Sequence, residues 1–319
     1  MKKVTLKDIA NELNITVGAV SHVMNGIDDI SEETKKKVLE TADRLGYISN
    51  SSAASLRLGK TFTIAVIVPD ISNPHIAQQI KLIEDKLSLS GYSIIILNTN
   101  EDNKSERSAI VSACSKQVDG ILICPTQHST DNIEFLEKID IPFVLIGRYF
   151  AEYDTDYVCA DDVKSGYLAG KYLAEKSCTN PLYIGAYEYI EASRKRFEGL
   201  KNAFSECGTE ISSERFVKIS SRGDNVSEVM EKLAADNISF DSIVAFSDLV
   251  AFEVMSVVKN VPVIGFDAIN THLHMPFSGV SIGMVDGGWA EKAASSLLKK
   301  ISGYKKRIHE IIDVKLYEF

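Results

Sequence analysis

The apolar residues among the first 48 positions recur at the three- to four-residue spacing of amphipathic helices. This pattern predicts three helices, over about residues 6–13, 17–24 and 31–45, each with a residue at its start that caps helices well. Two helices joined by a tight turn and braced by a third predict a helix-turn-helix. The core-facing side chains are expected to be Leu6, Ile9, Ala10, Leu13, Val20, Val23, Met24, Val38, Leu39, Ala42 and Leu45.

The pattern changes after residue 60, where short apolar runs alternate with helix-length amphipathic stretches. Strands that alternate with helices form βαβ units, so the body is predicted to be α/β, with parallel sheets covered by helices on both faces. A last strand is expected over residues 311–317. The other predicted strands cover residues 63–68, 93–97, 120–124, 143–146, 182–186, 242–246 and 262–266.

Polar residues follow the ends of these predicted strands. Open parallel sheets bind ligands beyond the carboxyl ends of their strands, so a polar fringe there is compatible with a polar ligand. The alternative is that loops simply begin at these positions. The residues concerned are Asp70, Asn98, Thr126, Arg148, Asp248 and Asp267.

Composition narrows the class of protein. The chain has 319 residues, of which 45% are hydrophobic, enough for more than one core. It contains no apolar run of about 18 residues, and its N-terminus is polar where a signal peptide needs an apolar stretch. The five cysteines show neither C-x-x-C spacing nor an accompanying histidine cluster, which is typical of free thiols in a reducing cytoplasm. We therefore expect a cytoplasmic protein, without contact to a membrane.

No nucleotide-binding, metalloprotease or serine-hydrolase motif is present, so no catalytic residue, metal site or cofactor is predicted. The net charge of −9 argues at first against a nucleic-acid partner. However, residues 1–60 hold nine Lys and Arg against eight Asp and Glu, a net charge of +1. The remaining residues therefore carry a net charge of −10. The acidity therefore belongs to the body, and the weakly positive head predicts DNA binding with a shallow dependence on salt.

Several motifs follow one another in the order found in the lactose-repressor (LacI) family of bacterial transcription regulators, which the chain resembles over about residues 4–300. The head motifs include Val-Ser-His-Val-Met-Asn-Gly, and the body motifs include Val-Ile-Gly-Phe-Asp. The matching segments are residues 4–10, 20–26, 30–34, 45–47, 55–57, 59–61, 64–74, 118–121 and 263–267.

The resemblance implies a sequence-specific repressor that binds pseudo-palindromic, double-stranded operator DNA as a homodimer, with its second helix in the major groove. Thr16, Val17, Gly18, Ser21 and His22 would face the bases, and His22 would donate to guanine or face a phosphate. Residues resembling phosphate clamps are Thr5, Asn25 and Tyr47. In the hinge, Asn50 and Ala53 match the family, and Leu56 takes the place of the leucine that wedges into the minor groove.

For the body, the resemblance implies two subdomains, like those of a periplasmic sugar-binding protein, that clamp a small-molecule effector, most simply a sugar or sugar derivative. His75 and Ile76 replace an aromatic pair, and Ser247 replaces an asparagine, so no family ligand can be carried over directly. The implied effector-binding residues are Asn73, His75, Ile76, Arg148, Asp161, Ser193, Arg196, Ser247, Asp248 and Asp267.

The expected domains are a helix-turn-helix head over residues 1–48, a hinge over 49–60, one subdomain over 61–160 plus about 286–312, and another over 161–285 plus the C-terminal end. No leucine heptads follow the last predicted strand, so a dimer is expected rather than a tetramer. Two alternatives remain open. One is a catabolite-control-type regulator whose main effector is a partner protein, and the other is an α/β enzyme fused to a DNA-binding head.

Overall fold

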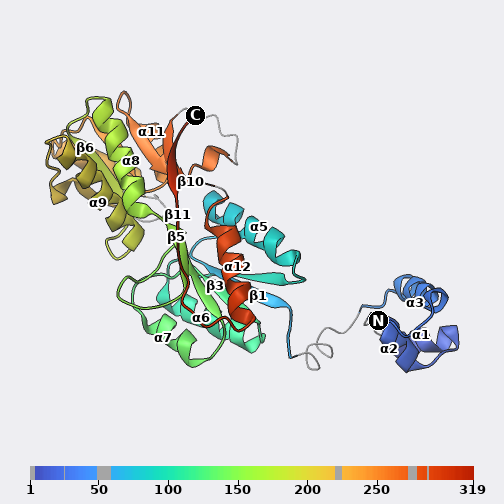
Figure 1. Cartoon of the computed structure of the whole chain (residues 1–319). Helices are drawn as coiled ribbons and strands as arrows, with labels where there is room; N and C mark the ends of the chain where they lie inside the picture. Colours follow the sequence, from blue (N-terminus) through green and yellow to red (C-terminus); the bar gives the residue numbers. More distant parts are fainter. Residues whose placement is uncertain (1–3, 25, 49–58, 220–224, 272–278, 286) are drawn as a thin grey trace. The chain divides into compact units, whose positions relative to one another are not determined.

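The computed structural model describes residues 4–24, 26–48, 59–219, 225–271, 279–285 and 287–319. The chain divides into a head unit, Met1–Thr61, and a body unit, Phe62–Phe319 (Figure 1). The head is helical and the body contains two six-stranded sheets covered by helices, which confirms the predicted fold class. Among the described residues, no helix is both long and apolar enough to cross a bilayer.

The head contains the three predicted helices, α1 (Leu6–Leu13), α2 (Val17–Met24) and α3 (Glu32–Leu45). Local chemistry sets their ends. At the start of α1, the backbone N–H and the hydroxyl of Thr5 donate to Asp8 Oδ2 at 2.8 and 2.7 Å. Asn14 ends α1 in the left-handed region at φ 57°, a conformation that asparagine tolerates better than most residues.

One small core holds the head together. Its buried members come from all three helices, and Val20 and Val23 of α2 are among them, as predicted. Leu39 is an exception: it was expected on the core face of α3, but it is 52% exposed, so that prediction is wrong. The buried residues are Ile9, Ala10, Val20, Val23, Val38 and Ala42.

The first sheet of the body has the strand order β11-β5-β4-β3-β1-β2, and all its pairings are parallel. Its strands are β1 (Thr63–Val68), β2 (Ser93–Asn98), β3 (Gly120–Ile123), β4 (Phe143–Ile146), β5 (Tyr157–Ala160) and β11 (His309–Ile312). The helices that cover it are α5 (Pro74–Ser88), α6 (Asn103–Ser115), α7 (Asp131–Lys138) and α12 (Trp289–Ile301).

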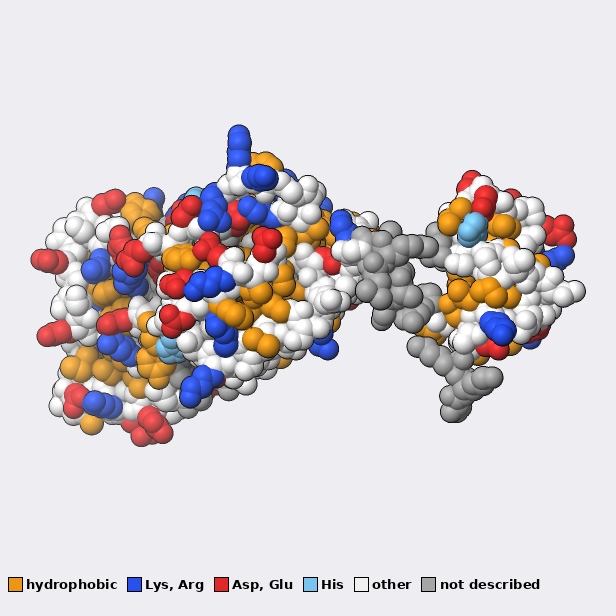
Figure 2. All heavy atoms as spheres, turned by 90° about the horizontal axis from the view of Figure 1, so that it is seen from below, with side chains coloured by type: hydrophobic (Ala, Val, Ile, Leu, Met, Phe, Trp, Pro, Cys, Tyr) orange, Lys and Arg blue, Asp and Glu red, His pale blue; other side chains and the backbone are white. Residues whose placement is uncertain are grey.

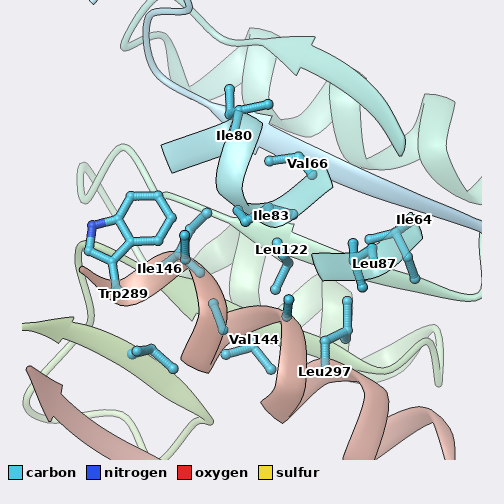
Figure 3. Packing of buried hydrophobic residues seen from close by; sticks show 14 of the residues in the cluster. Ile64, Val66, Ile80, Ile83, Leu87, Leu122, Val144, Ile146, Trp289 and Leu297 are labelled. Carbon is cyan, nitrogen blue, oxygen red and sulfur yellow. The ribbon is translucent and has the colours of Figure 1, made fainter. Parts of the chain in front are cut away.

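Successive side chains of β1 point to opposite faces of this sheet and pack into a hydrophobic core on each face. Ile64 and Val66 pack against α5 and α12, in the cluster that contains Trp289 (Figure 3). Ala65 and Ile67 point to the opposite face, toward α6 and α7. Burial on both faces explains why β1 reads as a continuous apolar run rather than an alternating one.

The second sheet has the order β12-β10-β9-β8-β6-β7. Its strands are β6 (Pro181–Gly185), β7 (Phe216–Lys218), β8 (Ser242–Ala245), β9 (Val263–Phe266), β10 (Val280–Met284) and β12 (Val314–Glu318). The helices are α8 (Asp162–Glu175), α9 (Glu191–Glu206), α10 (Val226–Ala235) and α11 (Asp248–Val257), with short 3₁₀ turns at Ser213–Arg215 and Ile269–Thr271. Core residues of α8 and α9 cluster on one face, and those of α10 and α11 on the other.

The C-terminal strand differs from the prediction. Residues 311–317 were expected to form one strand, but the chain forms β11 in the first sheet and β12 in the second, with Asp313 between them. The β12 strand pairs antiparallel with β10, so the second sheet is not wholly parallel. The chain also passes between the sheets after β5 and after β10, so three connections join the two halves of the body.

Candidate functional site

Helix α2 presents a small, mostly uncharged surface. Thr16, Val17 and Gly18 at its start are exposed, and Ser21 and His22 one turn later are half-buried. The Thr16 hydroxyl accepts from the backbone N–H of Ala19 at 3.2 Å and so caps the helix, as predicted. The predicted DNA-facing side chains of this helix therefore lie together on its accessible side.

His22 has a partner that the sequence did not indicate. Its Nδ1 lies 2.7 Å from Oδ2 of Asp29, and the two side chains are 45% and 51% exposed. Asp29 belongs to the connection between α2 and α3. An acidic side chain thus lies directly beside the one histidine of the head.

The proposed phosphate contacts are only partly described. Thr5 is exposed, with its hydroxyl donated to Asp8, whereas Tyr47 is half-buried and packs against the head core. Asn25 lies outside the described residues. The three hinge positions, Asn50, Ala53 and Leu56, lie outside them as well.

Most basic side chains in the described part of the head are paired with acids. Lys35 binds Asp28 and also Glu32 at 2.6 Å, Lys37 binds Glu33 at 2.7 Å, and Arg44 pairs with Glu12. The face drawn in Figure 2 shows acidic and basic groups interspersed on the head, with apolar groups between them. The head therefore offers no concentrated basic patch on that face.

A pocket of about 280 Å³ lies between the two sheets of the body. Both halves contribute to its wall, chiefly through loops at the carboxyl ends of strands and the first turns of helices, as expected for such sheets. Seven of the ten predicted effector residues line it: Asn73, His75, Ile76, Arg148, Arg196, Ser247 and Asp267.

Arg196 is held on the second-sheet side of the pocket. Its Nε donates to Asp162 Oδ1 at 2.8 Å and its Nη1 to the Phe246 carbonyl at 2.7 Å, while the guanidinium lies 4.5 Å from the ring centre of Phe266. Burial raises the pKa of the Asp162 carboxyl, and the guanidinium opposes that shift. Such a fixed, planar donor is suited to recognising oxygen acceptors.

The position of Arg196 depends on close contact between α8 and α9. A Cβ at Gly166 of α8 would lie 1.8 Å from the Arg196 carbonyl oxygen, and one at Gly199 of α9 would lie 1.9 Å from the Val163 carbonyl oxygen. Only glycine permits these approaches. They bring Arg196 of α9 against Asp162, the first residue of α8.

Arg148 occupies the first-sheet side. It makes a two-pronged ion pair with Glu101, at 2.6 and 2.9 Å, and donates to the Pro125 carbonyl at 3.2 Å. The side chains of Arg148 and Glu101 are only 10% and 16% exposed. Burial disfavours the charge, but Glu101 more than offsets it and raises the pKa of Arg148. Each half of the body thus supplies one arginine, already oriented by an acid.

An aromatic ring does enter the pocket, although His75 and Ile76 replace the family's aromatic pair. Trp289 was expected in the core, and it is 2% exposed within the core of the first sheet. It also lines the pocket. Its ring lies edge-on to His75, with 6.5 Å between ring centres. Asn73 fixes His75 by capping α5, with its Oδ1 accepting from the His75 N–H at 2.9 Å.

Three predicted residues are not on the pocket wall. Asp161 is the N-cap of α8 and accepts from the Lys164 N–H at 2.9 Å, whereas its neighbour Asp162 lines the pocket. Ser193 is fully buried and donates to the Ala186 carbonyl at 3.3 Å. Asp248 is 2% exposed behind Ser247, and its Oδ2 accepts from the Ile269 N–H at 2.8 Å.

Sequence reasoning missed Asp162, Glu101 and Phe246. Asp162 carries the same signal as Asp161, because both follow β5. Glu101 and Phe246 lack a motif of their own, and only their contacts with Arg148 and Arg196 reveal them. Within the described ranges, no three His, Cys, Asp or Glu side chains are arranged to hold a metal ion.

Comparison with known proteins agrees with this geometry. Residues 5–50 match the model of bacterial regulatory proteins of the lacI family, and residues 61–299 match that of periplasmic binding proteins and the sugar binding domain of the LacI family. The chain belongs to the LacI family. Like the rest of that family, this LacI-family protein combines a DNA-binding head with an effector-binding body. Relatives include the HTH-type transcriptional regulators RegA of Clostridium saccharobutylicum and DegA of Bacillus subtilis, each 29% identical over more than four-fifths of this chain.

Individual relatives support the same assignment. The LacI-family chain is 31% identical to catabolite control protein A of Priestia megaterium, over 85% of this chain and 83% of that protein. It is 26% identical to a periplasmic binding protein/LacI transcriptional regulator from Alkaliphilus metalliredigens complexed with D-xylulofuranose, with a TM-score of 0.68 and 80% and 97% of the chains covered. The Lac repressor dimer bound to operator and an anti-inducer shares the fold, with a TM-score of 0.86 at 15% identity over 99% and 98% of the chains.

Proposed function

We propose that this protein is a sequence-specific repressor whose operator affinity is set by a small polar molecule bound between the two halves of its body. The observation that carries the proposal is the pair of pre-oriented arginines. Arg148 comes from the first-sheet half and Arg196 from the second, and they face one pocket. A ligand that contacts both halves binds one relative arrangement better than another, and that difference in affinity is what drives an allosteric change.

The proposed effector is a sugar or a closely related polyol. Carboxylates, guanidinium groups and an indole ring line the pocket, and such a mixture suits a molecule with several hydroxyl groups and one apolar face. Its size, about 280 Å³, is near the lower end of the range of small-molecule sites, about 300–1,000 Å³, and favours a small ligand. The relative that holds D-xylulofuranose supports this class.

On the DNA side, we propose that α2 enters the major groove and that Thr16, Val17, Gly18, Ser21 and His22 face the bases. Thr5, Asn25 and Tyr47 are proposed to contact phosphates. The hinge residues Asn50, Ala53 and Leu56 are proposed to act at the centre of the operator. A homodimer would place two heads on a pseudo-palindromic site.

We keep the proposed domain boundaries, with the head at 1–48, the hinge at 49–60 and the subdomains at 61–160 plus about 286–312 and 161–285 plus the C-terminal end. The membership of the strands in two sheets supports the division of the body. The cytoplasm, where the DNA of a bacterium lies, is the proposed location. No catalytic role is proposed for any residue.

A partner protein as main effector is not favoured, because the features described above form a pocket of small-molecule size.

Two measurements test the proposal together. A thermal-shift screen of metabolites identifies ligands of the body, and calorimetry with Arg196→Ala then measures their affinity. We expect at least tenfold weaker binding by the variant; undiminished affinity would remove Arg196 from the site. Turnover of a bound metabolite would instead favour the enzyme alternative.

A further inference from the structure

The contact between His22 and Asp29 lies on the surface proposed to meet DNA. His22 is in the last turn of α2, and Asp29 follows seven residues later, before α3. Nδ1 and Oδ2 are 2.7 Å apart, and both side chains are about half exposed. The edge of the imidazole that bears Nε2 is not the one bound by Asp29, so it can serve an outside partner.

The backbone after α2 holds Asp29 in place. The N–H of Ile27 donates to the His22 carbonyl at 3.0 Å, and the N–H of Gly26 donates to the Val23 carbonyl at 3.0 Å. Gly26 has φ 66°, which completes the usual left-handed end of a helix. Ile30 then packs against the head core. Asp29 therefore lies between the hydrogen-bonded end of α2 at Ile27 and the packed side chain of Ile30, and both hold its backbone beside His22.

In a neutral imidazole, the contact determines which nitrogen carries the proton. A carboxylate only accepts hydrogen bonds, so Nδ1 must be the donor in this pair. In a neutral imidazole the other nitrogen, Nε2, then bears a lone pair and is an acceptor. The next basic residue along the chain, Lys35, is occupied by Asp28 and Glu32 and does not compete for Asp29 in this geometry.

We propose that Asp29 is a positioning residue that makes His22 a hydrogen-bond acceptor toward the base it faces. In the major groove, adenine and cytosine offer amino donors, whereas guanine offers only acceptors. The amino group of an adenine or of a cytosine should therefore be the partner of Nε2 within the base pair at that position. This replaces the expectation that His22 donates to guanine, and it rests on the proposed placement of α2 in the major groove.

The first test is selection of DNA from a pool with two randomised half-sites, using the full chain at about pH 8. Wild type is compared with His22→Ala, Asp29→Ala and the matched control Asp28→Ala, which removes an adjacent acid that pairs with Lys35. We expect wild type to prefer one base pair at one position by about two- to tenfold, the range of one hydrogen bond. This preference should be lost when purine replaces adenine, or 2-pyrimidinone replaces cytosine, in that pair, because each analogue lacks the amino donor. His22→Ala should lose this preference, Asp29→Ala should lose it or no longer respond to removal of the amino group, and the control should behave as wild type does.

Three results would overturn the proposal. One is wild-type affinity that stays unchanged when the amino group is removed from the base pair at the position that His22→Ala relaxes. Another is an Asp29→Ala variant with unchanged preferences at every position and an unchanged response to removal of the amino group. In the third, His22→Ala alters no position while wild type still selects a site; His22 then does not read a base and the proposal fails, although the protein's role as a DNA-binding repressor stands.

A second measurement does not depend on DNA or on the operator. Imidazole ¹⁵N chemical shifts of the full chain report which nitrogen is protonated, and the His22 signal is identified by its loss in His22→Ala. We expect the proton on Nδ1 in wild type and a shift toward Nε2 in Asp29→Ala. A wild-type proton on Nε2 would contradict the role given to Asp29.

Discussion

Asp248 is a buried acid whose ionisation should make the stability of the body depend on pH. It begins α11, is 2% exposed, and its Oδ2 accepts from the Ile269 N–H at 2.8 Å. Burial, reinforced by the negative charge of Asp267, raises the pKa of its carboxyl from 3.8 to about 7. Asp248→Asn keeps the shape and the acceptor for Ile269 but removes the charge.

The direction of the pH dependence of stability follows from which state, folded or unfolded, holds the proton. Because the pKa of Asp248 is higher in the folded state, folded protein binds a proton that unfolded chain releases between about pH 4 and 7. The stabilisation is therefore fully present below pH 4 and is lost as the pH rises through about 7. Each pH unit in this window is equivalent to about 1.4 kcal/mol, so wild type should lose about 2–3 kcal/mol relative to Asp248→Asn between about pH 5 and 8.

Urea unfolding followed by circular dichroism at both pH values measures this difference. The matched control is Asp313→Asn. Asp313 pairs with Lys164, whose hydrogen bond lowers the pKa of that carboxyl, so its own change falls below this pH range. The reasoning is refuted if the difference in unfolding free energy between wild type and Asp248→Asn is the same at both pH values.

Three further predictions concern the pocket and the DNA. Glu101→Gln should destabilise the protein by about 3 kcal/mol in urea unfolding, because Arg148 is left buried without its partner; a loss below about 0.5 kcal/mol would contradict the importance of the pair. Moving one half-site of a selected operator by about five base pairs, half a helical turn, should weaken binding at least tenfold in an anisotropy titration, and unchanged affinity would exclude paired heads. Leu56→Ala should reduce both affinity and the bending of operator DNA, whereas wild-type bending would show that the minor-groove wedge is wrongly assigned.

Strong local periodicity made much of the fold predictable. The bounds of α1, α2 and β1 match the prediction because each has a clear apolar pattern or cap. The strands that were missed, β5, β7 and β10, are three to five residues long and include half-exposed positions. The break at Asp313 was not predictable, because apolar residues stand on both sides of it and only tertiary pairing assigns them to different sheets.

The pocket was predictable to the extent that family motifs mark its strand ends. Those motifs led to Arg196 and Asp267, but they could not distinguish Asp161 from Asp162. One of this adjacent pair caps the helix backbone and the other turns to Arg196, a choice made by the close packing of α8 on α9. Glu101 lies far from Arg148 in sequence and carries no local signal at all.

Operator affinity with and without a pocket ligand tests the central claim most directly. The experiment uses anisotropy of a selected operator, a compound that raises the melting temperature of the full chain, and the Arg196→Ala variant. The account predicts that the compound changes wild-type operator affinity at least fivefold, the lower end of typical allosteric coupling, in either direction. Arg196→Ala should bind operator normally without the compound and lose the response. A compound that binds wild type through Arg196 yet leaves operator affinity unchanged would contradict control of DNA binding from this pocket.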